Sequence, residues 1–162
     1  MTILSWKKCL LVLALASGIF AGTLQPSSAF LDKTRFVAHL GVAYFCFHHW
    51  VLKPYQEGAF QSGAPHRIST IVKGGVALLF AVHEVKVAQK IAETSNDPLL
   101  QKLDAGVATL AGSFATVGEK LKSGNFAPQD VVGLSSVTDL FKSQASASGA
   151  TIKDVPVEIP GH

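Results

Sequence analysis

The histidines are the residues of this 162-residue chain with the clearest capacity for chemistry. Imidazole nitrogens bind haem iron and transition metals, and they donate or accept protons near neutral pH. Three of the histidines lie in one apolar segment, 36–52, which is an unusual density for such a segment. The six are His39, His48, His49, His66, His83 and His162.

Helical pairing could bring two of these histidines onto one cofactor. Two helices joined by residues 55–64 would pack antiparallel, which places His83 about one turn from His39. The pair could give two axial nitrogens to a haem b, because helical bundles hold cofactors between facing helices. No Cys-x-x-Cys-His motif occurs, which excludes covalently attached c-type haem.

The same pairing places His66 within about one turn of His48 and His49, beside the connecting loop. His48 or His49, together with His66 and Glu57, could hold zinc or another transition metal such as copper. His48 and His49 point about 100° apart on a regular helix, so the two cannot bind one ion as an adjacent pair. The simpler interpretation, which we favour for both groups, is that the histidines are half-buried residues at the edge of the core and bind no cofactor.

Cys46 is the one cysteine outside the first 29 residues, so the mature chain cannot form an internal disulfide. Its flanking residues, Phe45 and Phe47, predict that the thiol is buried. Cys46 and His49 are three residues apart and could share a soft-metal site. Because basic residues end the same helical stripe, we favour the interpretation that this is the more hydrated side of the helix.

Residues 1–29 predict a secretory signal peptide that is removed from the mature chain. Two lysines precede a long apolar stretch, and Ser27 and Ala29 place small residues before a cleavage point at Phe30. The alternative is an uncleaved anchor, but the apolar run is short for a membrane span of about 20 residues. We therefore expect an exported protein, in the periplasm or the extracellular space.

Charge and motifs exclude several classes of function. The chain carries 14 basic and 11 acidic residues, and Lys7 and Lys8 leave with the signal peptide, so the mature chain is nearly neutral. It has no cluster of lysines and arginines, so nucleic acid is not an expected partner. Gly-x-Ser-x-Gly, phosphate-binding glycine loops and His-Glu-x-x-His do not occur, so we do not expect an enzyme.

Apolar periodicity predicts four helices and no strand, over 32–53, 65–94, 98–123 and 128–144. The first is expected to end at Lys53, because Pro54 disfavours helical geometry in the residue before it. Asp97 and Gly124 are typical cap and stop residues for the third helix. The second helix is expected to carry one apolar stripe of Ile68, Val72, Gly75, Leu79 and Val82, with Ile71, Leu78 and Val85 beside it. The third is expected to turn inward a seam of Leu103, Val107, Leu110, Phe114, Val117 and Leu121.

Four amphipathic helices with short links predict an all-α, antiparallel four-helix bundle of up-down-up-down topology over 30–144. A flexible linker and an extended, proline-containing tail are expected over 145–162, lying along the bundle or reaching a partner. Gly74 and Gly75 in mid-helix suggest that a neighbouring helix approaches closely. The mature chain is not expected to span a membrane, because its apolar segments are short of about 20 residues.

The first helix is apolar nearly all round, so it is either central in the bundle or covered by another chain. Tyr44, Phe45 and Trp50 are the candidate residues for contact with a partner, which would be a second copy or another envelope protein. These features favour a non-catalytic binding or structural/interaction module. The alternative, from a different class, is a haem- or transition-metal-binding bundle that uses the cross-helix histidines.

Overall fold

The computed structural model describes residues 27–159. The expected all-helical class is confirmed, since no strand occurs in that range. Most of the predicted signal peptide, residues 1–26, lies outside the described residues, as does His162. The helical elements are α2 (Ser28–Phe47), η1 (His48–Leu52), α3 (Lys53–Gln56), α4 (Arg67–Thr94), α5 (Pro98–Ser123) and α6 (Pro128–Ala147).

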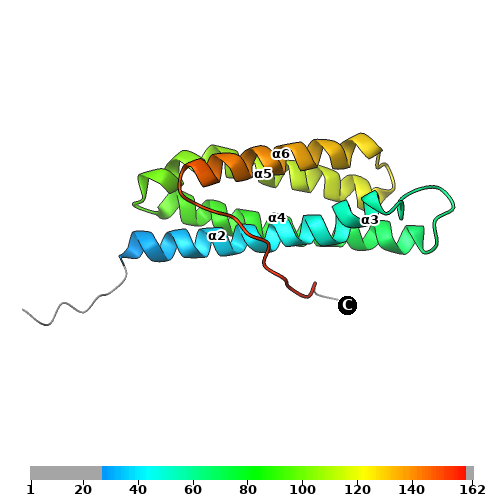
Figure 1. The fold of residues 1–162 in the computed structure, drawn as a ribbon, viewed down its shortest axis with the longest axis horizontal. Helices are drawn as coiled ribbons and strands as arrows, with labels where there is room; N and C mark the ends of the chain where they lie inside the picture. The colour runs from blue at the N-terminus through cyan, green and yellow to red at the C-terminus, as the bar shows by residue number, and fades with distance from the viewer. Residues whose placement is uncertain (1–26, 160–162) are drawn as a thin grey trace, which may run out of the picture.

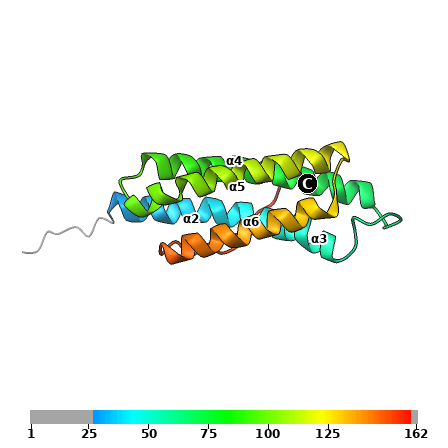
Figure 2. The same ribbon diagram turned by 90° about the horizontal axis from the view of Figure 1, so that it is seen from above.

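The four long helices lie side by side along the long axis of the molecule, as Figures 1 and 2 show from two directions. Helix α4 packs most extensively, against α5 on one side and α2 on the other, and α6 packs on α5. One continuous cluster of buried apolar side chains fills the space between them. The end at which residues 57–66 and 124–127 connect the helices is called the loop end below.

The sequence signals of α5 are confirmed in detail. The Asp97 side chain accepts a hydrogen bond from the Leu99 N–H at 2.9 Å, which caps the first turn. Gly124 ends the helix with φ of 76°, a left-handed conformation that glycine adopts without strain. All six residues of the predicted seam are buried.

Helix α4 approaches its neighbours closely at two glycines, as expected. A Cβ on Gly75 would lie 3.1 Å from the Lys122 nitrogen and 3.3 Å from the Gly118 oxygen, both in the α5 backbone. A Cβ on Gly74 would lie 3.0 Å from the Trp50 carbonyl oxygen. The glycines therefore let α4 lie against two backbones at once, which offsets their cost of about 1 kcal/mol each within a helix.

The sequence predicts that the first helix ends at Lys53. In the structure it continues through η1 and α3 to Gln56. In η1 the Lys53 N–H donates to the His48 carbonyl, one residue beyond the α-helical partner. Pro54 has no N–H to donate, and this wider π-helical turn lets the chain pass the proline without stopping.

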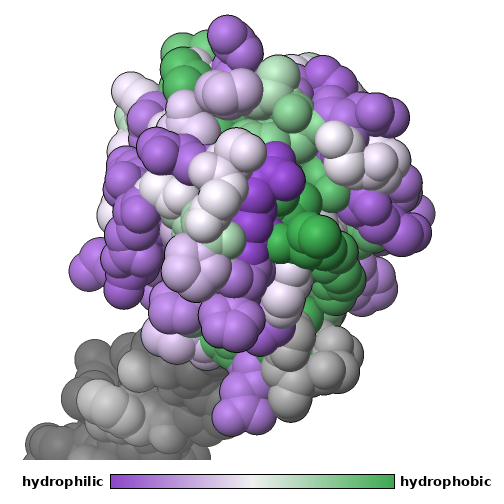
Figure 3. All heavy atoms as spheres, turned by 90° about the vertical axis from the view of Figure 1, so that its right-hand side faces the viewer, coloured by the Kyte–Doolittle hydropathy of each residue, from purple (hydrophilic) through white to green (hydrophobic). Residues whose placement is uncertain are grey.

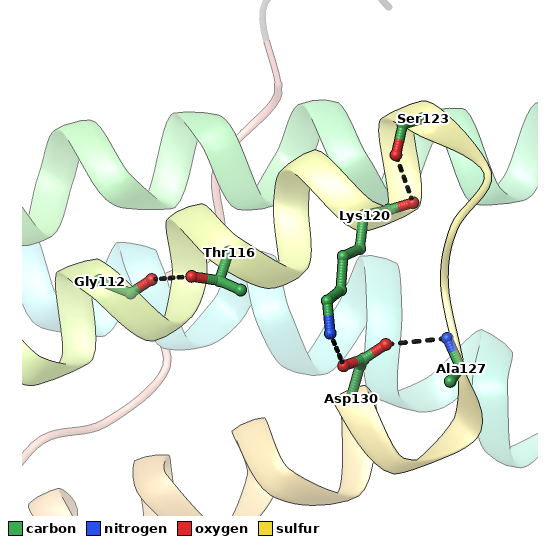
Figure 4. A network of polar contacts seen from close by, with 6 residues as sticks. All are labelled: Gly112, Thr116, Lys120, Ser123, Ala127 and Asp130. Atoms are coloured by element: carbon green, nitrogen blue, oxygen red, sulfur yellow. Dashed lines mark hydrogen bonds and ion pairs between the residues drawn. The ribbon is translucent and has the colours of Figure 1, made fainter.

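Asp130 joins α5 to the start of α6 (Figure 4). Its carboxylate accepts hydrogen bonds from the Lys120 ammonium at 2.5 Å and from the Ala127 N–H at 2.8 Å. The bond from Lys120, then that from Ala127, lowers the pKa of the Asp130 carboxyl below its usual range. The same side chain thus satisfies a backbone donor at the helix start and neutralises a lysine of the neighbouring helix.

The segment after α6, residues 150–159, crosses α2 on the outside of the bundle, as the red segment of Figure 1 shows, and is called the strap below. Helix α6 itself ends at Ala147, three residues beyond the expected Gln144. Ile152 and Ile159 are buried, and the Val155 N–H donates to the Gly41 carbonyl at 3.0 Å. The strap therefore packs along the bundle, one of the two arrangements that the sequence left open.

Candidate functional site

His39 meets a carboxylate of α4 and not the histidine predicted to face it. Its Nδ1 lies 2.7 Å from Oε2 of Glu84, and both side chains are largely screened from solvent. His83 is exposed and lines a shallow surface cavity of about 370 Å³ with Arg35 and Lys86. The two predicted axial ligands of a haem thus have separate surroundings in this structure.

The three histidines of the predicted metal site also have separate surroundings. Nδ1 of His48 lies 2.7 Å from Oδ2 of Asp154 in the strap, and the His49 ring stacks on Phe45 with centroids 5.0 Å apart. His66 is exposed, in a left-handed conformation just before α4. Across residues 27–159, no three His, Cys, Asp or Glu side chains gather closely enough to hold a metal ion. His48 therefore contacts the carboxylate of Asp154, a residue far away in the sequence, and not the other histidines of the predicted metal site. No local pattern in the sequence indicates this contact.

The Cys46 thiol is buried and forms no disulfide, so its predicted burial is confirmed. Burial, followed by the negative charge of Glu84, raises the pKa of this thiol to about 12. The thiolate is the form that binds metals and attacks electrophiles, so Cys46 is in a poor state for either role.

The aromatic residues proposed for partner contact divide into two groups. Tyr44 is fully buried, and its hydroxyl donates to the Thr138 carbonyl at 2.6 Å, so its proposed contact with a partner is wrong for this structure. Burial, then Asp139 and Asp154, raises its pKa above the ordinary tyrosine value. Phe45 and Trp50 are partly exposed.

Helix α4 carries a row of exposed aliphatic side chains, two of which belong to its predicted apolar stripe. Ile68, Val72 and Val76 have exposed fractions of 76%, 44% and 38%, and they follow one another at intervals of four residues. Ile68 and Val72 belong to the predicted apolar stripe, yet they are exposed, whereas Ile71 and Leu78, predicted to lie beside that stripe, are in the core. The apolar residues of α4 surround the helix, so their spacing did not determine which side faces inward.

Two pockets open at the loop end beside this row. The α4–α5 pocket, of about 230 Å³, has Ile71, Val72 and Leu121 among its lining residues. The loop pocket, of about 520 Å³, is lined in part by Tyr55, Phe60 and Gln61. Arg67 and Phe126 line both pockets, so the two pockets are adjacent. Figure 3 views the molecule from this end, where apolar side chains reach the surface between polar ones.

Arg67 is held in place at the junction of the two pockets. Its Nε donates to the Phe60 carbonyl at 2.9 Å, which leaves the terminal nitrogens of the guanidinium for other acceptors. Phe60 in turn packs edge-on against Phe126, with ring centroids 5.5 Å apart. The arrangement can bind by apolar contact and can place a fixed positive charge beside it.

Comparisons with known proteins give no family or relative: no protein-family model, curated protein or solved structure matches this chain. Among the described helices, α4 is the one that is long and apolar enough to cross a membrane by length and composition alone. A core helix passes the same test, and α4 packs against both α2 and α5.

Proposed function

We propose that this chain is an exported, non-catalytic binding or interaction module, built as an antiparallel bundle of up-down-up-down topology. Its working surface is the loop end, where the α4 row and the two pockets adjoin. It acts in the periplasm or the extracellular space, on a second copy of itself or on another envelope component.

One observation carries this proposal. Ile68, Val72 and Val76 expose aliphatic surface in a single row although the same helix buries many other apolar residues. Scattered exposed apolar residues are ordinary, but a row beside pockets is typical of a surface that contacts something. The strap already covers part of α2, and the row on α4 remains exposed.

Binding of the apolar dye ANS tests the role of the row. We expect Ile68→Asp and Val72→Asp to lower the fluorescence of bound dye several-fold, because a carboxylate in the row opposes apolar binding. Leu140→Asp, which removes an aliphatic side chain of α6 whose exposure lies between those of Ile68 and Val72, should leave the signal unchanged. Equal loss in all three variants, or no dye binding at all, would contradict the proposal.

The export proposal has its own test. N-terminal sequencing of protein from the natural host should begin at Phe30, and a chain that begins at Met1 would contradict processing. The haem alternative is tested by adding hemin: a Soret band that disappears in both His39→Ala and His83→Ala would favour it over the binding module.

A further inference from the structure

All the charged residues that line the two adjacent pockets at the loop end are basic. Arg67 lines both pockets, and Lys122 lines the α4–α5 pocket. No carboxylate is among the residues that line either one. Asp130, two residues after the lining residue Pro128, is held by Lys120. The positive charge of Arg67 and Lys122 is therefore not balanced by an acidic group within the pockets.

The rest of the lining is mostly apolar or aromatic. Ile71, Leu121 and Phe126 are buried or half-buried in the α4–α5 pocket, and Phe60 and Tyr55 continue the apolar surface into the loop pocket. An occupant that matches both properties has an apolar body and an anionic group. Arginine suits that group, because its planar fork pairs with carboxylate or phosphate oxygens through two parallel hydrogen bonds.

The loop pocket is large enough for a small molecule. Its volume of about 520 Å³ lies in the range in which small ligands bind, about 300–1,000 Å³. The α4–α5 pocket adds about 230 Å³ on the other side of Arg67 and Phe126.

We propose that the two adjacent pockets bind a single-chain anionic amphiphile, such as a fatty acid. The anionic group lies on the Arg67 guanidinium, with Lys122 beside it, and the hydrocarbon chain lies against Ile71, Leu121 and Phe126. This inference rests on the proposed function, since it names the ligand class of the same surface.

Calorimetric titration of the full chain tests the ligand class with three probes of equal chain length, each below its micellar concentration. We expect dodecanoate to bind at least tenfold more tightly than dodecanol or dodecyltrimethylammonium, because a charge-assisted bond is worth about a tenfold gain or more. Equal affinity for all three probes would overturn the recognition of an anion. Binding of ANS without binding of dodecanoate would overturn the ligand class and leave the proposed function standing.

Variants locate the anionic group. Arg67→Gln should weaken dodecanoate binding roughly tenfold and leave dodecanol unaffected. Arg67→Lys should retain part of the affinity, because it keeps the charge without the fork. Arg35→Gln, at an exposed arginine of α2, is the matched control and should bind as the parent does. If Arg67→Gln and Arg35→Gln bind dodecanoate equally, while circular dichroism shows both folded, the proposal is wrong.

Discussion

The His48 ring nitrogen lies 2.7 Å from a carboxylate oxygen of Asp154, although the two residues are 106 positions apart in the chain. The contact attaches the strap to the turn in which α2 passes into η1. Both side chains are partly exposed, so the pair is expected to be modest in strength. A double-mutant cycle of His48→Ala and Asp154→Ala should give a coupling free energy of about 0.5–1 kcal/mol in urea unfolding. Strictly additive effects would show that the contact contributes nothing.

The strap needs a residue without a side chain at position 41. A Cβ there would collide with the Lys153 carbonyl oxygen and the Val155 side chain. Gly41→Ala should therefore lower the free energy of unfolding by about 1–3 kcal/mol. It should also loosen the strap backbone, so that trypsin cleaves faster after Lys153, whose side chain is already exposed. Gly112→Ala is the control, since nothing lies within 4 Å of a Cβ at that helical position. It should raise stability by up to about 1 kcal/mol, and a similar loss in both variants would contradict the close approach.

His39 and His83 should differ in their effect on stability. His39→Ala leaves the largely buried Glu84 carboxylate without its partner, so the free energy of unfolding should fall by about 1–3 kcal/mol. His83→Ala removes an exposed side chain, and the change should stay within about 0.5 kcal/mol. Chemical denaturation of both variants measures the difference. Equal effects would mean that the His39–Glu84 contact does not contribute.

Cys46 should resist alkylation in the folded protein. Its thiol is buried, and its raised pKa keeps it protonated, whereas iodoacetamide reacts with the thiolate. We expect mass spectrometry to show little modification at pH 8 in native buffer and complete modification in urea. Rapid labelling of the native protein would show that the first helix opens readily, in conflict with its buried position.

Asp130 should make the free energy of unfolding depend on pH in the acidic range. Its pKa is lower in the folded protein than in the unfolded chain, so the stabilisation is fully present above the usual carboxyl pKa and is lost as the pH falls through the folded value. Asp130→Asn should lower the free energy of unfolding by about 0.5–1 kcal/mol at pH 7, because solvent screens the pair with the partly exposed Lys120. Below about pH 4 the difference from the parent should shrink. A difference that is constant with pH would contradict the role of the carboxylate.

The sequence determined α5 far better than α4, and the reason is the distribution of apolar residues. Helix α5 has one narrow apolar seam between Asp97 and Gly124, so only one face of this helix can be turned to the core. Helix α4 has apolar residues nearly all round, so a rotation that buries Ile71 or one that buries Ile68 satisfies the same pattern.

That uncertain rotation also explains the histidine pairs. His83 and Glu84 are adjacent on α4 and point about 100° apart, so the rotation of α4 decides which of them reaches His39. The partner of His48 could not be found by helix pairing at all, because Asp154 belongs to a segment with no periodic signal. Helix pairing therefore predicted which elements meet and not which side chains do.

The outer face of α2 is covered by the strap, whose residues are synthesised long after α2 itself. A chain that is still being made, or one cut before residue 150, leaves Gly41 and its neighbours without the cover that Ile152 and Val155 provide. Premature products should therefore differ from the finished protein in solubility and in susceptibility to proteases, even with every long helix formed.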